Sequence, residues 1–288
     1  RGVTATETRY MVDLDDIRCH RQLVVRLEGN AEAVGLGNIK AAGLCEKTLV
    51  LIKLGHLGLG LIGCPECNLW RSLAGPAELQ AKAAGLEVVY KEAYPTGTKD
   101  FAAMIEAMKA RNPDALIAAG YTGDMIVLAR QTSEQKVPLK LIGFTLGPTL
   151  PGFVEALGSR AENILEPVQW TPDMPWKDEI FGWTAAEYAT LCRTRLGREC
   201  DYHPPQSTAA LQVYQRAIEK ADSLDPKKVR DALAQTNLMT AYGPVRFNEQ
   251  GQNIAKGMSV VQLQNGKPVV VFPVEGAKAR FVYPMTAR

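Results

Sequence analysis

The sequence is poor in the side chains that carry most enzyme chemistry at neutral pH. Its three histidines are His20, His56 and His203, and none of them lies in a catalytic or metal-binding motif. The nucleophile motif GxSxG is also absent. Because acid–base and nucleophilic catalysis need such groups at fixed spacings, the sequence favours a binding protein over an enzyme.

The sequence also lacks an excess of charge of one sign and any long apolar run. It has 33 Lys plus Arg against 31 Asp plus Glu, a net charge of +2. This balance gives no field that would attract nucleic acid, and no window approaches the roughly 18 to 20 apolar residues of a membrane-spanning helix. The chain begins at Arg1 with no signal segment, so we expect a processed chain or a fragment.

Cysteine is too scarce for a disulfide scaffold, with six residues in 288. Cys64 and Cys67 have the CxxC spacing of a redox pair or half a zinc site, but no second ligand pair completes a tetrahedral site. Two incidental thiols near a turn explain this motif better, and we expect no metal. Cys192 and Cys200 lie on either side of a predicted helix end, where they either form a short local disulfide or remain thiols.

The middle of the chain alternates between strand and helix patterns. Short apolar segments predict strands, and 3.6-residue spacing predicts helices between them. The predicted strands cover 86–90, 115–119, 139–144 and 164–170, and the helices 99–111, 124–135 and 149–158, the last capped by Thr149. Apolar strands separated by helices imply an α/β fold with a parallel sheet flanked by helices.

The last third has a different order of elements. Three helices are predicted in series over 181–196, 207–221 and 226–235, and then a hairpin with strands 258–263 and 268–272 around Asn265-Gly266. This order does not extend a parallel sheet and predicts that the chain passes back to another lobe, with the hairpin near the junction. Before residue 65 the patterns are weak; they suggest strands over 23–27 and 48–52 and a helix over 31–44.

Aromatic and hydroxyl residues follow three consecutive predicted strands. Tyr121 and Thr122 follow one strand, Thr145 and Gly147 the next, and Trp170 the third. In an open parallel sheet, ligands bind beyond the carboxyl ends of the strands. Together these residues predict a cleft for a small polar molecule, although each one alone is equally explained as covering a strand end or capping a helix.

The segment Gly58–Gly63 fits the dinucleotide pattern GxGxxG. A dinucleotide site also needs a helix that opens on the third glycine and an acidic residue about 20 positions later at a strand end. Pro65 interrupts the expected helix, and Glu87 and Glu92 are poorly placed. An NAD(P)-dependent oxidoreductase built on this loop is therefore the alternative hypothesis.

An ordered series of segments resembles the type I periplasmic solute-binding proteins of ABC importers, in the leucine/isoleucine/valine-binding group. The series begins with AAGLEVV at 83–89, YPTGTKDF at 94–101 and RNPDAL at 111–116, and continues with FTLGPTLP at 144–151, DYH at 201–203, YGPVRF at 242–247 and the closing hairpin. The resemblance covers about residues 69–284. It implies two α/β lobes that close on a ligand around a hinge, without catalysis or a cofactor.

The resemblance also assigns parts of the chain. It implies a first lobe from 1–46 plus 201–255, incomplete or divergent, and a second lobe from 47–200 plus 256–288 with the hinge hairpin. Tyr121 matches a family ligand-contact position, and Leu69 or Trp70 falls near another, which is usually aromatic. Thr145 is neutral where amino-acid binders place an acid, which leaves room for an acid, an amide or another polar solute.

The family role implies an extracytoplasmic monomer that carries an amino acid or related solute to a membrane permease. A ligand-sensing domain that reuses the same fold is a second alternative.

Overall fold

The computed structural model describes residues 32–33, 52–53, 58–64 and 68–285. Two short strands, β1 (Glu32–Ala33) and β2 (Ile52–Lys53), pair with each other in antiparallel fashion. The strand predicted over 23–27 lies outside the described residues. Most of the helix predicted over 31–44 also lies outside them, and its two described residues, 32–33, form a strand and not a helix. Within the described residues, no helix is both long enough and apolar enough to span a membrane.

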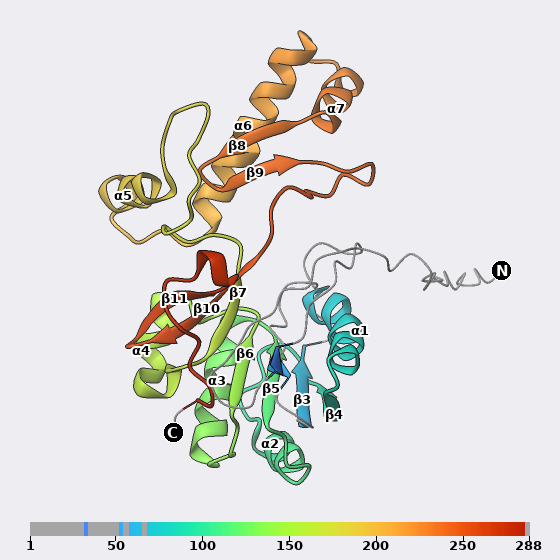
Figure 1. Ribbon diagram of the computed structural model, residues 1–288, viewed down its shortest axis with the longest axis vertical. Helices are drawn as coiled ribbons and strands as arrows, with labels where there is room; N and C mark the ends of the chain where they lie inside the picture. The colour runs from blue at the N-terminus through green and yellow to red at the C-terminus, as the bar shows by residue number, and fades with distance from the viewer. Residues whose placement is uncertain (1–31, 34–51, 54–57, 65–67, 286–288) are drawn as a thin grey trace, which may run out of the picture.

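A seven-stranded sheet forms the larger part of the structure (Figure 1). Its spatial order is β11-β10-β7-β6-β5-β3-β4, with parallel pairing from β4 through β7 and antiparallel pairing from β7 through β10 to β11. The strands are β3 (Gly58–Gly63), β4 (Glu87–Ala93), β5 (Ala115–Ala119), β6 (Leu141–Phe144), β7 (Leu165–Val168), β10 (Ser259–Gln264) and β11 (Lys267–Phe272).

Four helices cover the two faces of this sheet, namely α1 (Asn68–Ala83), α2 (Ala102–Lys109), α3 (Thr122–Glu134) and α4 (Pro151–Leu157). Leu59 and Leu61 of β3 belong to one buried cluster with Ala81 of α1, whereas Ile62 belongs to another with Ile105 of α2 and Met125 of α3. Successive residues of a strand point to opposite faces. The core therefore forms on both sides of the sheet, as expected for buried parallel strands.

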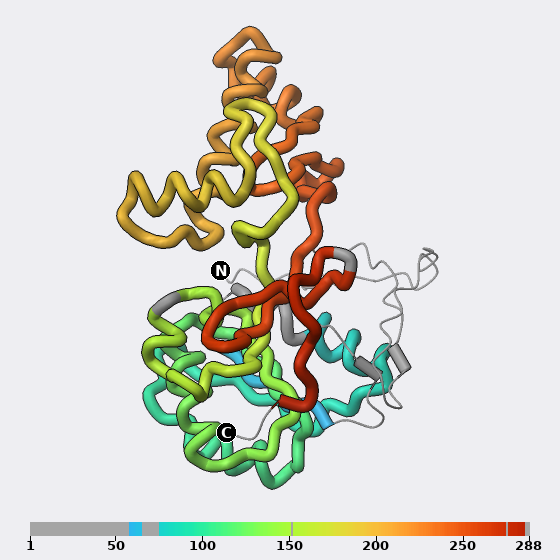
Figure 2. Tube along the Cα trace, turned by 60° about the vertical axis from the view of Figure 1, so that its left-hand side comes forward, coloured from blue at the N-terminus to red at the C-terminus, as the bar shows by residue number. Residues whose placement is uncertain are grey.

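A second group of helices and strands forms a separate lobe beyond the carboxyl ends of the parallel strands (Figure 1). They are α5 (Ala185–Leu196), α6 (His203–Ala221), α7 (Pro226–Ala234) and the antiparallel pair β8 (Asn237–Thr240) and β9 (Gly243–Arg246). Ala185 and Ala189 of α5 pack with Ala209 of α6, Tyr242 and Trp170. The chain passes between the sheet and this lobe twice, after β7 and before β10 (Figure 2).

Local sequence explains the ends of several elements. Thr184 and Glu187 form a reciprocal capping box at the start of α5, and Gly197 ends this helix with φ 64°. Asp225 caps α7 by accepting hydrogen bonds from the N–H groups of Lys227 and Lys228. The predicted hairpin is confirmed, because Asn265 and Gly266 both adopt positive φ between β10 and β11.

Two sequence-based expectations about local structure are wrong. The residue that caps α4 is Leu150 rather than Thr149, and no side chain caps that helix. The glycine-rich segment Gly58–Gly63 is not a loop but the whole of strand β3, with five of its six residues buried. Strands β8 and β9 and helix α1 were not predicted at all.

Candidate ligand-binding site

The parallel strands place their carboxyl ends at one edge of the sheet, and the strand order changes direction between β3 and β5. Chain order runs from β3 outward to β4 and then returns to β5 on the other side of β3. Crevices at such switch points are the usual ligand sites of open α/β sheets. Tyr121 follows β5 at this point, and Trp70 lies in the first turn of α1, although its side chain is outside the described part.

The loop from Thr145 to Leu150, after β6, is fixed by contacts with its neighbours. The Gly120 N–H donates to Thr145 Oγ1 at 3.3 Å, which ties the end of β5 to the end of β6. Gly147 has φ 129°, and a Cβ there would lie 2.7 Å from the Phe153 ring. The Thr149 N–H donates to Glu166 Oε2 of β7 at 2.7 Å. This loop therefore has a defined shape that depends on a glycine and on a buried carboxyl group.

A cavity of about 240 Å³ lies beside this loop, where the chain crosses from the sheet to the other lobe. The loop contributes Thr145 and Thr149, and the end of β7 contributes Glu166. The rest of the lining comes from Leu146, from Pro167 and Val168 of β7, from the crossing segment 169–173, from residues 200–202 before α6, from Met258 before β10, and from Pro268 of β11. The cavity is thus bounded by both parts of the structure.

Two of the predicted site residues, Thr145 and Trp170, line this cavity. Trp170 is only 3% exposed, and its Nε1 donates to the Ala241 carbonyl oxygen at 2.8 Å. Its indole therefore also anchors the crossing segment to the other lobe. Gln169 lines the cavity as well, and its Oε1 accepts a hydrogen bond from the Tyr242 hydroxyl.

The other described candidates lie beside the cavity rather than on its wall. Tyr121 is 52% exposed at the N-cap of α3, and Thr122 is the first residue of that helix. Gly147 lies close to the Phe153 ring, where a larger residue would not fit. Tyr121 directly follows Gly120, whose N–H bonds to Thr145 Oγ1. These residues lie at the same edge of the sheet as Thr145, and their part in binding stays a prediction.

The sequence analysis missed Glu166 as a site residue. Its side chain lines the cavity and is 2% exposed, and burial raises the pKa of its carboxyl group to about 7. Hydrogen bonds from Thr149 and from the Gly147 N–H oppose this rise. A carboxylate inside the apolar run 164–170 was the signal that could have found it.

Lys256, close to the second crossing between the lobes, was missed as well. Its Nζ lies 3.0 Å from the centroid of the Tyr242 ring and 4.8 Å from that of Trp176, and it donates to the Tyr242 carbonyl oxygen at 2.6 Å. Burial lowers the pKa of its amine to about 6. Because Lys256 does not line the cavity, we interpret this contact as an anchor for the crossing segment.

A second hollow, of about 560 Å³, lies on the lobe formed by α5–α7, β8 and β9. Its lining is mainly apolar and includes Val213, Leu233, Val245 and Phe247. Polar side chains such as Gln206, Arg230 and Glu249 also line it, but they are on one lobe only, since all the lining residues lie between 206 and 251. The cavity beside Thr145 is smaller, but it combines hydroxyl, amide and carboxyl groups and is the better candidate site.

A dinucleotide site at Gly58–Gly63 does not fit the structure. The phosphate-binding glycines of that motif form a turn between a strand and a helix, whereas here they lie within β3, paired with β4 and β5. A Cβ at Gly60 would lie 3.1 Å from Met108 Sδ, and one at Gly58 would lie 3.2 Å from the Val89 methyl groups. These glycines make room for core side chains.

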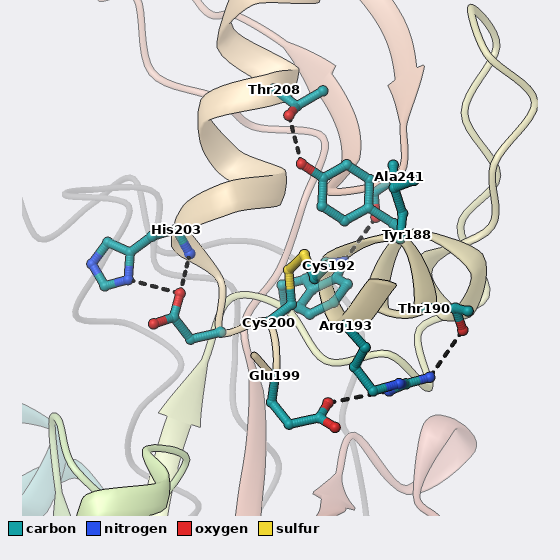
Figure 3. The surroundings of a disulfide bond; sticks show 12 residues. Tyr188, Thr190, Cys192, Arg193, Glu199, Cys200, His203, Thr208 and Ala241 are labelled. Atoms are coloured by element: carbon teal, nitrogen blue, oxygen red, sulfur yellow. Dashed lines mark hydrogen bonds and ion pairs between the residues drawn. A yellow bond between two sulfur atoms is a disulfide. The ribbon is translucent and has the colours of Figure 1, made fainter. Parts of the chain in front are cut away.

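A disulfide bond joins Cys192 near the end of α5 to Cys200, on the segment that leads into α6 (Figure 3). Cys200 also lines the cavity, next to Asp201 and Tyr202. The bond therefore fixes the segment that forms the cavity wall on the side of the α5–α7 lobe. Cys64 is buried with its Sγ 2.7 Å from Thr96 Oγ1, and Cys67 lies outside the described residues.

Comparison with known proteins identifies the family. The sequence pattern described as "Periplasmic binding protein" matches residues 61–268. This chain belongs to the periplasmic binding protein family. The fold agrees with this family. A leucine-binding protein of Thermotoga maritima superposes with a TM-score of 0.67, at 22% identity, over 75% of this chain and 60% of that one. The predicted type I architecture is confirmed.

The predicted resemblance to the leucine/isoleucine/valine-binding group is also confirmed. A Leu/Ile/Val-binding protein homologue of Brucella abortus is 26% identical over 220 residues, which is 73% of this periplasmic binding protein and 53% of the relative. A branched-chain amino acid binding protein of Streptococcus pneumoniae, solved with isoleucine, has a TM-score of 0.62 at 17% identity, over 79% of this chain and 60% of that one. The chain thus spans about half the length of the curated relatives it matches.

Proposed function

We propose that this chain is the extracytoplasmic solute-binding component of an ABC importer, which binds a small polar solute and delivers it to a membrane permease. The observation that carries the proposal is the cavity at the crossing between the two parts of the structure, lined from both. Closure of two lobes on a ligand requires contacts of this kind on both sides. Amino acids and related organic acids or amides are the candidate solutes, in keeping with the names of the relatives.

We propose the two-lobe division of the family for this chain, with the sheet and the hairpin in the second lobe. The boundary predicted at residue 200 separates α5 from the elements with which it packs. The contacts of Ala185 and Ala189 with Ala209 and Tyr242 favour a first lobe that includes α5 and begins at about residue 171. The first lobe would then include all the described elements from α5 to β9.

We propose that the ligand contacts Thr145 and the crossing segment that begins at Trp170, with Tyr121, Thr122, Gly147 and Trp70 at or near the same edge. Thr171 gives a direct reason to expect a polar ligand. Its hydroxyl is buried and has no hydrogen-bond partner among the described residues, and Thr171 is one of the residues that line the cavity. A buried polar group without a partner costs about 1–3 kcal/mol, so a ligand that bonds to this hydroxyl would recover part of that cost.

The location outside the cytoplasm has independent support. Disulfide bonds form and persist in oxidising compartments and are rare in cytosolic proteins. The Cys192–Cys200 bond therefore fits a periplasmic or other extracytoplasmic protein.

A thermal-shift screen of the purified chain against amino acids, organic acids, amides, amines and NAD(P) tests the proposal. A ligand at 100 times its dissociation constant adds about 2.7 kcal/mol of stability, which the screen detects. We expect stabilisation by a small polar solute. Stabilisation by NAD(P) alone, or by no small solute, would contradict the proposal.

Two matched variants locate the site. Thr171→Val and Thr132→Val each remove a buried hydroxyl that lacks a hydrogen-bond partner, but only Thr171 lines the cavity. We expect both variants to raise the melting temperature of the ligand-free protein. Only Thr171→Val should reduce the ligand-induced shift, and equal shifts in the two variants would place the ligand elsewhere.

A further inference from the structure

The cavity beside Thr145 has an unbalanced set of charged side chains. Three acidic residues line it, Glu166, Asp173 and Asp201, and its described lining contains no Lys, Arg or His. Glu166 is the deepest of the three, at 2% exposure, whereas Asp173 is exposed and Asp201 is partly buried. The cavity therefore presents negative charge to whatever enters it.

Within the part of the chain that the structure describes, the carboxyl group of Glu166 has neutral hydrogen-bond donors but no cationic partner. Its Oε2 accepts from the Thr149 N–H at 2.7 Å, and the Thr149 hydroxyl and the Gly147 N–H also stabilise the charged form. Among the described residues, no Lys, Arg or His forms an ion pair with it. Buried carboxylates are normally paired, because removal of a charge from water is costly.

The uncharged groups on the wall also favour a hydrogen-bond donor as ligand. Thr171 is 8% exposed, and its buried hydroxyl has no hydrogen-bond partner among the described residues, so it retains the capacity to accept a hydrogen bond. The indole of Trp170 lines the same space, and an aromatic face attracts a cation. An alkylammonium group has three N–H donors and one positive charge, which matches this set of acceptors.

We propose that the cavity selects solutes that carry a protonated amine, and that Glu166 is the carboxylate that receives it. This inference rests on the proposed function and narrows its ligand class. Because the described lining holds no cationic side chain to receive a carboxylate, the preferred ligand is an amine without a carboxyl group. The cavity volume of about 240 Å³ limits it to a small molecule.

The proposal has a consequence for pH. Burial favours the neutral form of Glu166, whose pKa is about 7, while an ammonium ion beside it favours the charged form. Binding below pH 7 therefore releases a proton, and amine affinity should rise about tenfold between pH 6 and pH 8. The titratable groups that share the cavity wall with Glu166 are Asp173, Asp201 and Tyr202, and none of them supplies a compensating positive charge.

Four probes with related branched skeletons test the charge preference by calorimetry. They are isopentylamine, the neutral 3-methylbutan-1-ol, leucine and 4-methylpentanoate, with putrescine as a second amine. We expect an amine to bind at least tenfold more tightly than the alcohol and the acid, and more tightly than leucine. If the acid, the alcohol or leucine binds best, the amine proposal is overturned while the proposed function stands. If no solute in this set or in the wider screen binds, both fail.

Glu166→Gln tests the assigned residue, since glutamine can still accept the Thr149 hydrogen bond but carries no charge. Glu155→Gln, the same change at an exposed position of α4, is the control. We expect Glu166→Gln to weaken amine binding at least tenfold and to abolish its rise between pH 6 and pH 8, and Glu155→Gln to change neither. Unchanged amine affinity in a folded Glu166→Gln variant would remove Glu166 from the site. If that variant does not fold, the pH profile of the wild-type protein decides, and a flat profile overturns the assignment.

Discussion

Reduction of the Cys192–Cys200 disulfide should measurably destabilise the lobe that contains α5–α7. The bond closes a short loop with a sequence separation of 8. In the chain-entropy model, a loop of this size restricts the unfolded state by about 2.5 kcal/mol at 25 °C. Cys192 is 4% exposed and packs with Tyr188 and Ala241, so the reduced thiols would remain in a packed site without further loss of contacts.

Urea unfolding followed by tryptophan fluorescence is the appropriate assay. Three of the four tryptophans, Trp170, Trp176 and Trp183, lie in the crossing segment and the connection into α5, so the signal reports chiefly on this lobe. We expect a reductant to lower the free energy of unfolding by about 2.5 kcal/mol. The double variant Cys192→Ala/Cys200→Ala should show no further effect of the reductant. An unchanged transition on reduction of the wild-type protein would refute the reasoning.

Three further predictions concern the sheet and its edge. Because the pKa of Glu166 is raised, the folded state binds its proton more strongly than the unfolded state between pH 4.5 and pH 7. The free energy of unfolding should therefore fall as pH rises through this range, by up to about 3 kcal/mol more in the wild-type protein than in Glu166→Gln. Urea titrations at several pH values measure this difference. Equal pH profiles of the two proteins would contradict this. Gly60→Val should lower the free energy of unfolding by about 1–3 kcal/mol, because Met108 leaves no room for the new side chain. The control Gly123→Ala should leave stability unchanged or raise it, because a Cβ there meets no atom within 4 Å. Equal effects of the two substitutions would show that β3 tolerates a side chain at residue 60. Tyr121→Ala should weaken solute binding by about 1–3 kcal/mol in calorimetry without altering the melting temperature, and unchanged affinity would exclude Tyr121 from the site.

Much of the sheet could be predicted because its strands are continuous apolar runs bounded by turn residues. The strand 115–119 has the predicted limits, and the Asn265-Gly266 hairpin forms as expected, since both depend on local preferences of the chain. Strand β3 was missed because its glycines suggest a loop. Gly58 and Gly60 instead make room for the side chains of Val89 and Met108, which are far away in the sequence.

The candidate site was predicted in part, because the ends of the apolar strands could be located in the sequence. Sequence position placed Thr145 and Trp170 at strand ends, and both line the cavity. The carboxylate inside the apolar run 164–170 marked Glu166 as unusual, but its surroundings could not be read from the sequence, because the Thr149 N–H and the cavity come together only when β6 and β7 pair. The cavity wall from residues 200–202 likewise depends on how α5, the disulfide and α6 fold together.

A crystal structure of the chain with the best solute from the thermal-shift screen tests the central claim most directly. We predict that the solute lies in the cavity between the strand ends and the α5–α7 lobe, within hydrogen-bond distance of the Thr171 hydroxyl and in contact with Thr145. Electron density for the solute in the apolar hollow of α6 and α7, or anywhere outside this cavity, would contradict the account.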